Sequence, residues 1–197
     1  MKNVGILNVG IGNIKSLKNA FEVMGLNVIE VSNEKHFQLF DILVMPGVGN
    51  YNTFHNLLIK HKIIKNIEKW IKLNKPTIGI CLGGQYLFEY SEEAGDIKGL
   101  GVFKGHICKF ENAYCNTGWK LVNFNKLNFE DNKFYFNHSY YFKSKNNSNI
   151  IGTSLAKTEK KIPVFLNKKN IFAIQFHPEK SKHNGLIFLK EILDKWT

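Results

Sequence analysis

The residues best suited to carry out chemistry lie in the segment Lys75–Glu89, which reads KPTIGICLGGQYLFE. Cys81 follows a short β-prone run and stands between Gly79 and Gly83, in the G-x-nucleophile-x-G pattern of a strand-to-helix turn that exposes a nucleophile. Such a turn brings the backbone close to the positions two before and two after the nucleophile, where only glycine avoids a collision. A helix beginning at Gln85–Glu89 would place the sulfur at a helix N-terminus, which favours the thiolate.

A base for this thiol is available far downstream. We expect Asn170–Phe176 to be a strand, and it leads into His177, Pro178 and Glu179. A cysteine nucleophile needs a base within hydrogen-bond reach and a third group that fixes the tautomer of that base. His177 is the candidate base and Glu179 the candidate orienting group, because side chains two residues apart on an extended chain leave the same face. Pro178 favours extended backbone at His177.

Each motif also has a plain structural interpretation. Cys81 could be a buried cysteine on a core strand with two incidental glycines, and a His-Pro-Glu sequence is usually an ordinary turn. The two motifs occur together in this chain. Because each supplies what the other lacks, their combination favours a catalytic triad of Cys81, His177 and Glu179.

Four motifs, in the same order along the chain, resemble those of one family. GICLGGQ at 79–85 and QFHPEKS at 175–181 are similar to the two signatures of the class I (triad) glutamine amidotransferases. Within that family, PGVGNYNTF at 46–54 and FYFNHSYY at 134–141 most resemble the glutaminase subunits of imidazole glycerol phosphate synthases. The resemblance extends over essentially the whole chain.

The resemblance implies a glutaminase that converts glutamine to glutamate and ammonia through a thioester on Cys81, without a metal or an organic cofactor. It also implies an oxyanion hole formed by the backbone N–H of Val48 or Gly49 together with that of Leu82. His138 can be a substrate contact or a structural histidine. The other substrate-binding residues implied by the resemblance are Gln85, Ser139 and Tyr140.

The resemblance further implies a protein partner. Subunits of this kind pass ammonia to a separate synthase subunit, a (βα)8 barrel of the HisF type that carries a phosphorylated substrate. We therefore expect a heterodimer with low glutaminase activity of the chain alone and activation by the loaded partner. The residues that we expect at this interface are Asn13, Tyr135 and Lys180.

Two alternative functions stay open. The first is a paralogue that supplies ammonia to another synthase, such as one for nucleotide-sugar amidation in surface polysaccharide biosynthesis. Departures at Asn8-Val9 and at Gly118-Trp119-Lys120, where the family usually has Asp-Tyr and Gly-Trp-Asn, leave room for it. Gly84 also stands where the family commonly has Met. The second is a non-catalytic reactive-cysteine protein of similar fold, which would not need His177 and Glu179.

The first half of the chain predicts strands and helices in alternation, and this spacing implies a parallel sheet with right-handed crossovers. One helix is expected to carry Ile14 to Met24 on its apolar face, and another, single helix to carry a stripe from Leu57 to Ile71. The loop Gly10–Asn13 is not a dinucleotide fingerprint, because Lys15 stands where the third glycine would be. The expected strands are Val4–Asn8, Asn27–Val31, Ile42–Met45 and Thr77–Ile80.

The second half consists mainly of short strand-like segments separated by Asn, Lys and Gly, and it closes with a helix at about Asn184–Trp196. We predict one α/β domain over residues 1–197. Its fold is the flavodoxin-like, three-layer fold that the family resemblance implies, with a mostly parallel central sheet, helices on both faces and a mixed strand extension. The expected strands are Val102–Phe110, Lys120–Phe124, Lys133–Phe136, Tyr140–Lys143, Ile150–Ala156, Ile162–Leu166 and Asn170–Phe176.

The charge of the chain is strongly positive, with a formal net charge of +11, yet all 27 basic residues are lysine. Arginine is the preferred group for guanine edges and bidentate phosphate contacts, so we predict no nucleic-acid partner. No segment approaches the roughly 18 apolar residues of a membrane span, and the N-terminus lacks the pattern of a signal peptide. These features predict a cytoplasmic protein without a membrane partner.

The cysteines predict neither disulfides nor zinc. There are three of them at irregular spacings, which fits a reducing compartment. Cys108 and Cys115 lie near His106 in the sequence, but the chain has no C-x-x-C pair. We therefore expect these two to be core or surface thiols and predict no metal site.

Overall fold

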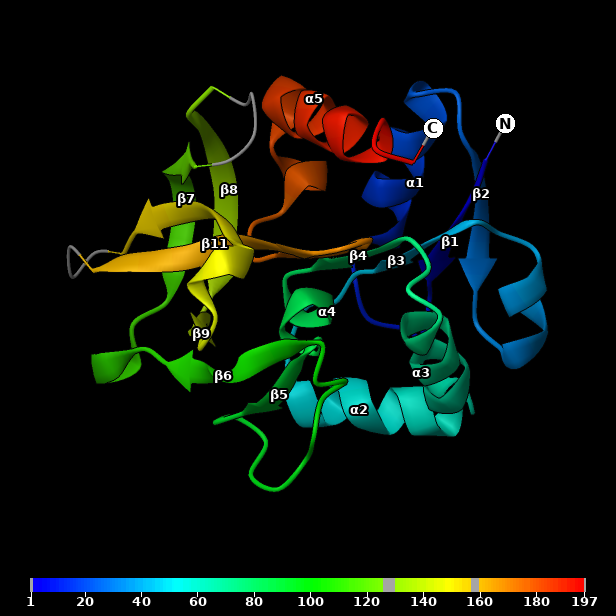
Figure 1. Ribbon diagram of the computed structural model, residues 1–197, viewed down its shortest axis with the longest axis horizontal. Coiled ribbons are helices and arrows are strands. Elements are labelled where there is room, and N and C mark those ends of the chain that lie inside the picture. The colour runs from blue at the N-terminus through cyan, green and yellow to red at the C-terminus, as the bar shows by residue number, and fades with distance from the viewer. Residues whose placement is uncertain (1, 126–129, 157–159, 197) are drawn as a thin grey trace.

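The fold has three layers built around one large sheet (Figure 1). The computed structural model describes residues 2–125, 130–156 and 160–196. The helices are α1 (Ile14–Val23), α2 (Tyr51–Lys60), α3 (Ile64–Lys72), α4 (Leu82–Gln85) and α5 (Lys182–Leu193), with short 3-10 helices η1 (Glu34–Gln38), η2 (Glu111–Ala113), η3 (Asn147–Asn149) and η4 (Pro178–Lys180). The strands are β1 (Asn3–Leu7), β2 (Asn27–Val31), β3 (Ile42–Met45), β4 (Thr77–Ile80), β5 (Phe88–Ser91), β6 (Phe103–Lys109), β7 (Asn116–Phe124), β8 (Asn132–His138), β9 (Tyr140–Ser144), β10 (Ile150–Leu155), β11 (Lys161–Lys168) and β12 (Ile171–Ile174).

The large sheet is parallel on one side and antiparallel on the other. Its strand order is β2-β1-β3-β4-β12-β11-β10-β7-β8, and the pairs from β2 to β12 are parallel. From β12 to β8 every pair is antiparallel. A second sheet, β5-β6-β9, lies beside it. The predicted α/β fold with a parallel core and a mixed strand extension is therefore confirmed.

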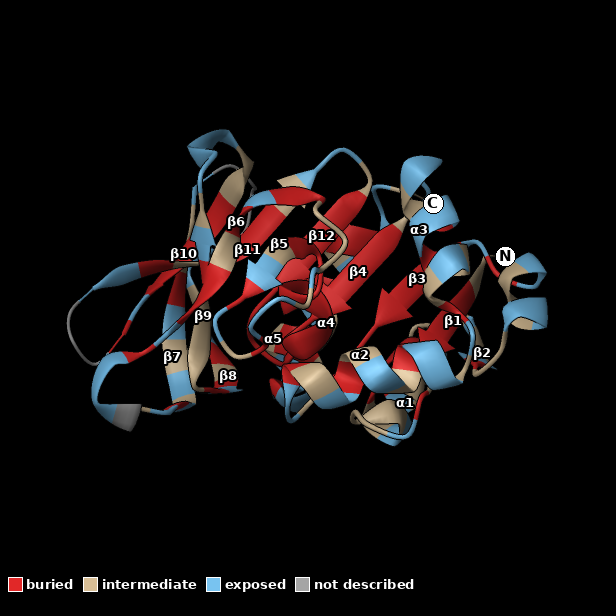
Figure 2. Ribbon diagram, turned by 90° about the horizontal axis from the view of Figure 1, so that it is seen from below, coloured by how far each residue is buried: buried red, intermediate tan, exposed pale blue. Residues whose placement is uncertain are grey.

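Alternation along the central strands fills a core on each face of the sheet. In β3, Ile42 and Val44 join the cluster that includes α1 and α5, whereas Leu43 and Met45 join the cluster that includes α2 and α3. Figure 2 shows the result, with the central strands buried and α2 exposed on the side that faces away from them, whereas α4 is buried throughout. Parallel strands covered by helices on both faces are mostly apolar, as β3 and β4 are.

The pairing of β4 with β12 determines where the site forms. These two strands are parallel neighbours, with Ile80 opposite Ile174. The carboxyl ends of parallel neighbours meet at the same edge of the sheet, and ligands of open α/β sheets bind outside that edge. The residues that follow β4 and β12 are Cys81 and Gln175, so the two predicted catalytic motifs meet there.

One predicted helix is two helices. The expected single helix with a stripe from Leu57 to Ile71 is interrupted after His61, because Lys62 adopts left-handed backbone with φ of 58°. Leu58 and Ile67 nevertheless lie in one core cluster. The stripe is continuous because α2 and α3 cover the same face of the sheet.

The helix expected to start at Gln85–Glu89 is also different. α4 spans only Leu82–Gln85, and the chain then enters β5. Phe88 is fully buried in β5 and packs on Phe103 and Phe142, with ring centroids 5.5 and 5.0 Å apart. This aromatic packing in the second sheet outweighs the local tendency of the segment to continue as a helix.

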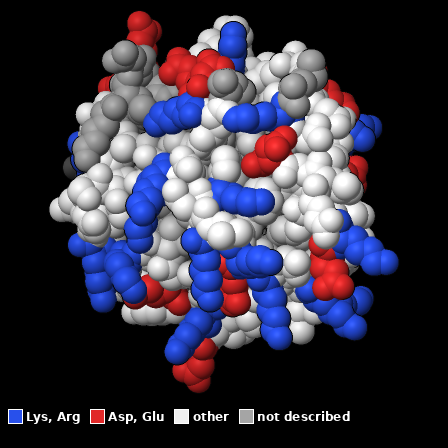
Figure 3. Space-filling model, turned by 45° about the vertical axis from the view of Figure 1, so that its right-hand side comes forward, with Lys and Arg blue, Asp and Glu red and all other residues white. Residues whose placement is uncertain are grey.

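The lysines do not gather into one patch on the face shown in Figure 3, where acidic and uncharged residues lie between them. Among the described residues, none of the helices has the length and apolar character of a membrane-crossing segment.

Candidate active site

Cys81 lies on the predicted elbow between β4 and α4. Its backbone has φ of 52° and ψ of −109°, an uncommon conformation for a residue with a side chain. The glycines that flank it are required by sterics. A Cβ on Gly79 would lie 2.7 Å from the carbonyl oxygen of Gly83, and one on Gly83 would lie 1.8 Å from the carbonyl oxygen of Met45. The turn is therefore built from glycine on both sides of the sulfur.

His177 and Glu179 form a buried pair beside the elbow. The Nδ1–H of His177 donates to Oε1 of Glu179 at 2.8 Å, and both side chains are 2% exposed. His177 is extended, as expected before Pro178, but Glu179 lies in η4 instead of on an extended chain. The predicted contact is present, while the predicted reason for it is wrong, because a 3-10 turn and not strand alternation aims the carboxylate at the ring.

The electrostatics favour a charged imidazole. Burial lowers the pKa of His177, but the negative charge of the Cys81 sulfur and the hydrogen bond to Glu179 outweigh it and raise the pKa to about 10. The Nε2 atom of His177 is buried, and a hydrogen bond with Cys81 is among the interactions that raise the pKa of the ring. An imidazolium whose Nε2 faces the sulfur is the arrangement that a cysteine nucleophile and its general acid need.

A buried amide network supports the sulfur from the other side. Gln175 follows β12, is fully buried, and its Nε2 lies 3.8 Å from Sγ of Cys81. Gln85 donates through Nε2 to Oε1 of Gln175 at 3.3 Å and to the carbonyl oxygen of Tyr140 at 3.2 Å. Both amide hydrogens of Gln85 are thus used within the protein. The predicted substrate contact of Gln85 stays a prediction, and the atom left for it is the carbonyl oxygen.

His138 has the structural role that the sequence left as one of two options. Its Nδ1–H donates to the carbonyl oxygen of Tyr140 at 2.7 Å, and its Nε2 lies 2.9 Å from Nδ2 of Asn116, from which it can accept. Burial lowers its pKa to about 4, so the ring is neutral. Ser139 is half-buried, and its carbonyl oxygen accepts from the N–H of Phe110 at 3.1 Å. This loop is fixed by its backbone, and its contact with substrate stays a prediction.

The loop after β3 packs against the elbow, as the predicted oxyanion hole requires. Val48 is half-buried and Gly49 is exposed with φ of 99°. The N–H of Leu82 donates to the carbonyl oxygen of Gly47 at 3.4 Å. In this conformation a carbonyl oxygen therefore occupies the Leu82 donor that the resemblance assigns to the oxyanion. Gly84 is equally enclosed, since a Cβ there would lie 2.9 Å from the carbonyl oxygens of Gly79 and Ile174.

Two of the three predicted interface residues, Tyr135 and Lys180, lie together at η4. Lys180 is exposed, and its Nζ lies 5.9 Å from the ring centroid of Tyr135. Asn13 directly precedes α1, a helix that contacts η4. Trp119, which is 43% exposed, packs edge-on against Tyr135 at 6.2 Å. Nothing in the sequence predicted a role for Trp119, although the Gly-Trp motif around it was visible.

Sequence reasoning also missed Ser181. Its buried hydroxyl donates to the carbonyl oxygen of His177 at 2.6 Å and accepts from the N–H of Tyr135 at 3.0 Å. The N–H of His177 in turn donates to the carbonyl oxygen of Tyr135 at 2.8 Å. The candidate general acid is thus held by backbone and hydroxyl contacts to β8, on which Tyr135 lies. A small polar residue after His-Pro-Glu-Lys is too common a pattern to predict this.

A second group of ionisable side chains lies outside this site. Glu92, His106 and Cys108 place their donor atoms within 4.8 Å of one another. Cys115, which the sequence analysis considered together with Cys108, is exposed and is not part of this group. Its sulfur instead contacts Thr117 and Asn137 at 3.0 and 3.8 Å. The sequence analysis looked for partners of Cys108 only among nearby residues, and it therefore missed Glu92, which lies 16 positions earlier in the chain.

Comparison with known proteins places this geometry in a family. Residues 6–193 match the family described as glutamine amidotransferase class-I. The chain belongs to the class I glutamine amidotransferases. It is an enzyme of that family, and the resemblance seen in the motifs of the sequence is confirmed.

Relatives and solved structures extend this assignment. The chain is 37% identical to the imidazole glycerol phosphate synthase subunit hisH of Cyanidium caldarium, with 100% of both chains covered. It is 38% identical to the HisH subunit of Pyrococcus furiosus, with 96% of this chain and 97% of the relative covered. The structure of PurLQS from Thermotoga maritima matches over 100% of both chains with a TM-score of 0.78 at 16% identity, which is a likeness of fold.

Proposed function

We propose that this chain is the glutaminase subunit of an imidazole glycerol phosphate synthase, which hydrolyses glutamine for histidine biosynthesis. The observation that carries the proposal is the meeting of the Cys81 elbow with the buried His177–Glu179 pair at one edge of the sheet. We infer the pathway from the HisH subunits, which the chain resembles over almost their full length. The cytoplasm, where such biosynthesis takes place, is the compartment that we propose.

The mechanism follows from the positions of three side chains. The thiolate of Cys81 attacks the side-chain amide carbon of glutamine, and the carbonyl π electrons move to oxygen. His177 then gives its Nε2 proton to the departing nitrogen, so that the C–N bond breaks, ammonia leaves and a thioester remains. Neutral His177 takes a proton from water, which attacks the thioester carbon. The C–S bond then breaks, the Cys81 thiolate leaves, and the product loses its carboxyl proton to solvent and departs as glutamate. Glu179 keeps Nδ1–H oriented, so Nε2 performs both transfers.

Two features support low activity of the chain alone. Cys81 is only 6% exposed, and the N–H of Leu82 is engaged by the carbonyl oxygen of Gly47. Loss of one oxyanion donor typically costs about 10²–10³ in kcat. We infer that rearrangement of the Gly47–Gly49 loop, which would free this N–H, accompanies activation by the partner.

The partner that we propose is a (βα)8-barrel synthase subunit, bound at the surface formed by Asn13, Tyr135 and Lys180 together with Trp119. Trp119 is exposed and Tyr135 is half-buried beside it, and tryptophan and tyrosine are residue types enriched in the energetically important part of an interface. Because Tyr135 holds both the N–H and, through Ser181, the carbonyl oxygen of His177, this surface is directly linked to the candidate general acid.

The test is glutamine hydrolysis by the chain with and without candidate synthase subunits of the same organism. We expect the imidazole glycerol phosphate barrel with its nucleotide substrate to raise the rate at least about 100-fold. Cys81→Ala should abolish the activity, whereas Cys115→Ala, the matched change of an exposed thiol, should retain it. Activation only by a synthase of another pathway, such as nucleotide-sugar amidation, would reassign the chain to a paralogue. Absence of hydrolysis with every candidate partner, together with an unlabelled Cys81 after treatment with a glutamine-derived electrophile, would overturn the enzymatic proposal.

A further inference from the structure

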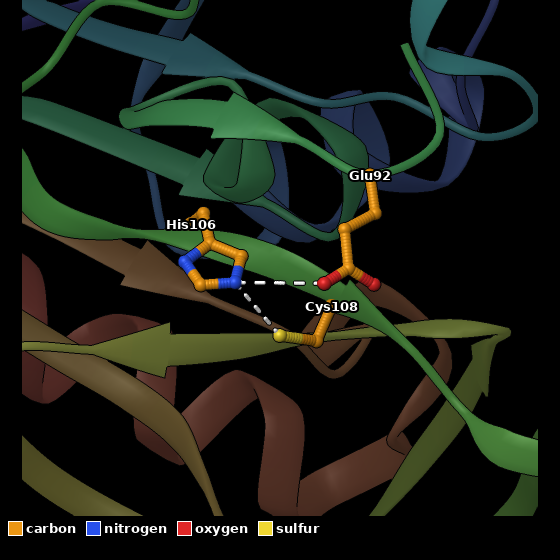
Figure 4. A group of neighbouring side chains, drawn as sticks. All are labelled: Glu92, His106 and Cys108. Carbon is orange, nitrogen blue, oxygen red and sulfur yellow. Dashed lines mark hydrogen bonds and ion pairs between the residues drawn. The ribbon is translucent and has the colours of Figure 1, made fainter. Parts of the chain in front are cut away.

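A second group of cysteine, histidine and glutamate lies on the small sheet, away from Cys81. Glu92 directly follows β5, and His106 and Cys108 are alternate residues of β6 (Figure 4). The Nε2 atom of His106 lies 3.1 Å from Sγ of Cys108 and 3.5 Å from Oε1 of Glu92. Nothing in the proposed glutaminase mechanism uses these residues.

The geometry differs from that of the catalytic triad in one decisive respect. In the triad, Glu179 binds Nδ1 of His177 and leaves Nε2 to face the sulfur, so that a proton can be relayed through the ring. In the second group, the carboxylate and the sulfur both approach the same nitrogen, Nε2 of His106. One ring nitrogen carries at most one proton, and Cys108 and Glu92 also contact each other through a side-chain hydrogen bond. The ligand atoms of all three side chains thus face one another around one point, as the ligands of a cation do.

We propose that Glu92, His106 and Cys108 bind a divalent cation of the zinc type, with water completing a tetrahedron. Zinc binds sulfur at about 2.3 Å and nitrogen or oxygen at about 2.0–2.2 Å, which places tetrahedral donors about 3.5 Å apart. The two separations from Nε2, 3.1 and 3.5 Å, are close to this value, and all three donors lie within 4.8 Å of one another. Thiolate and imidazole ligands select zinc over magnesium or calcium.

The surroundings hold the three ligands in place and leave a path from solvent. Oε2 of Glu92 accepts from the N–H of Lys109 at 2.7 Å, which leaves Oε1 directed at the site. The ring of Tyr90 stacks on His106 at 4.8 Å with an angle of 3° between the planes. Cys108 is buried and the side chain of His106 is 15% exposed, whereas that of Glu92 is 45% exposed and opens the site to water.

Binding must displace the proton of the thiol. Burial and the neighbouring Glu92 raise the pKa of Cys108, while Lys143 opposes them. A bound cation reverses this preference, because a coordinating thiol is deprotonated.

The experiment is a cobalt titration of the untagged, chelator-treated Cys81→Ser variant, in which the active-site thiol cannot contribute. We expect one equivalent of Co²⁺ to bind with a thiolate-to-cobalt charge-transfer band in the near ultraviolet, and Zn²⁺ to abolish the band by displacement. Absence of the band with saturating Co²⁺, in protein whose circular dichroism is native, would overturn the proposal.

Variants locate the ligands. In the same background, Cys108→Ser should remove the charge-transfer band, and His106→Gln and Glu92→Gln should each weaken the apparent affinity for Co²⁺ by at least about 10-fold, since even indirect ligand support is worth 10- to 100-fold. Cys115→Ser is the matched control and should leave the spectrum and the affinity unchanged. A band that disappears with Cys115→Ser and persists with Cys108→Ser would place the cation elsewhere and refute the site.

Discussion

The charge of His177 depends on the sulfur beside it. Burial works against the imidazolium, and only the thiolate of Cys81 and the carboxylate of Glu179 favour it strongly enough to raise its pKa to about 10. The charge of the imidazolium therefore depends on both partners, and His177 is not expected to keep it at neutral pH if Cys81 is removed.

Replacement of Cys81 by Ala should lower the pKa of His177 far below about 10, because burial then acts against one remaining partner, Glu179. Nitrogen NMR of the imidazole during a pH titration measures this directly. The ring of wild-type protein should stay doubly protonated at pH 8, while the ring of the variant should be neutral there. Cys108→Ala, which changes a thiol away from His177, should leave the titration as in wild type. An unchanged His177 titration in Cys81→Ala would contradict the ion pair.

Gln175 should contribute to the reactivity of the thiol. In Gln175→Glu the amide N–H that lies 3.8 Å from Sγ is replaced by a carboxylate, which disfavours the thiolate. A hydrogen bond to a charged group is worth about 1.5–3 kcal/mol, so the rate of Cys81 alkylation at neutral pH should fall by about 10-fold or more. Gln38→Glu, the same change at an exposed position, should have no effect on that rate. Equal rates of Cys81 alkylation in the two variants would show that Gln175 does not contribute to the reactivity of the thiol.

His138 should make the fold sensitive to acid. Its pKa is lowered by burial from 6.5 to about 4, so the unfolded chain binds a proton here that the folded chain does not. The stabilising contribution is therefore complete above pH 6.5 and is lost as the pH falls towards 4, by on the order of 3 kcal/mol. Urea unfolding at several pH values should show a steeper loss for wild type than for His138→Gln. Parallel stability profiles for the two proteins would disprove a neutral, buried His138.

The elbow at Cys81 brings the backbone of α4 close to two neighbouring strands, β3 and β4. Gly83 approaches β3 so closely that any side chain would meet the carbonyl oxygen of Met45, and Gly79 approaches the backbone of α4. The position of the sulfur is therefore set by contacts between backbones, which no rotamer change can relieve.

Gly83→Ala should be severely destabilising. Its Cβ would lie 1.8 Å from a backbone oxygen, so β3 and α4 must separate. We expect a loss of about 3 kcal/mol or more in the free energy of unfolding, measured by denaturant titration, and loss of glutaminase activity. Gly95→Ala, which also adds a Cβ but into open space at φ of 56°, should cost only about 1–2 kcal/mol and retain activity. A Gly83→Ala protein as stable as Gly95→Ala would show that the close approach is not present in solution.

The sequence predicted the elements whose signal is local. The apolar runs at Ile42–Met45 and Thr77–Ile80 are the strands β3 and β4, and the glycine spacing around Cys81 predicted the elbow. What it missed depends on contacts made elsewhere in the chain. β5 replaces a helix because Phe88 packs on Phe103 and Phe142, and Glu92 reaches His106 only because β5 and β6 are neighbours.

The whole molecule carries a large excess of lysine. A net charge of +11 from side chains spread over the surface means that folding brings like charges together. A basic, dispersed surface also suits association with an acidic partner, which fits the exposed Lys180 beside Tyr135.

Added salt should therefore stabilise the fold. The Debye length falls from about 30 Å at 0.01 M to about 8 Å at 0.15 M, so the repulsion among lysines is screened. We expect Tm to rise by several degrees over this range, by the same amount in NaCl and in KCl because the effect is not ion-specific. A Tm that falls with salt would mean that attractive ion pairs outweigh the repulsion.

The place of β12 in the sheet has a consequence for how the enzyme comes into being. β12 is the last strand along the chain, yet it lies between β4 and β11 near the middle of the large sheet. During synthesis the chain emerges N-terminus first, so Cys81 leaves the ribosome long before the strand that carries His177. The elbow can gain its partner strand only after β12 has been made. On the proposed mechanism, a ribosome that stops before β12 releases a chain that carries Cys81 without His177, and such a chain cannot consume glutamine.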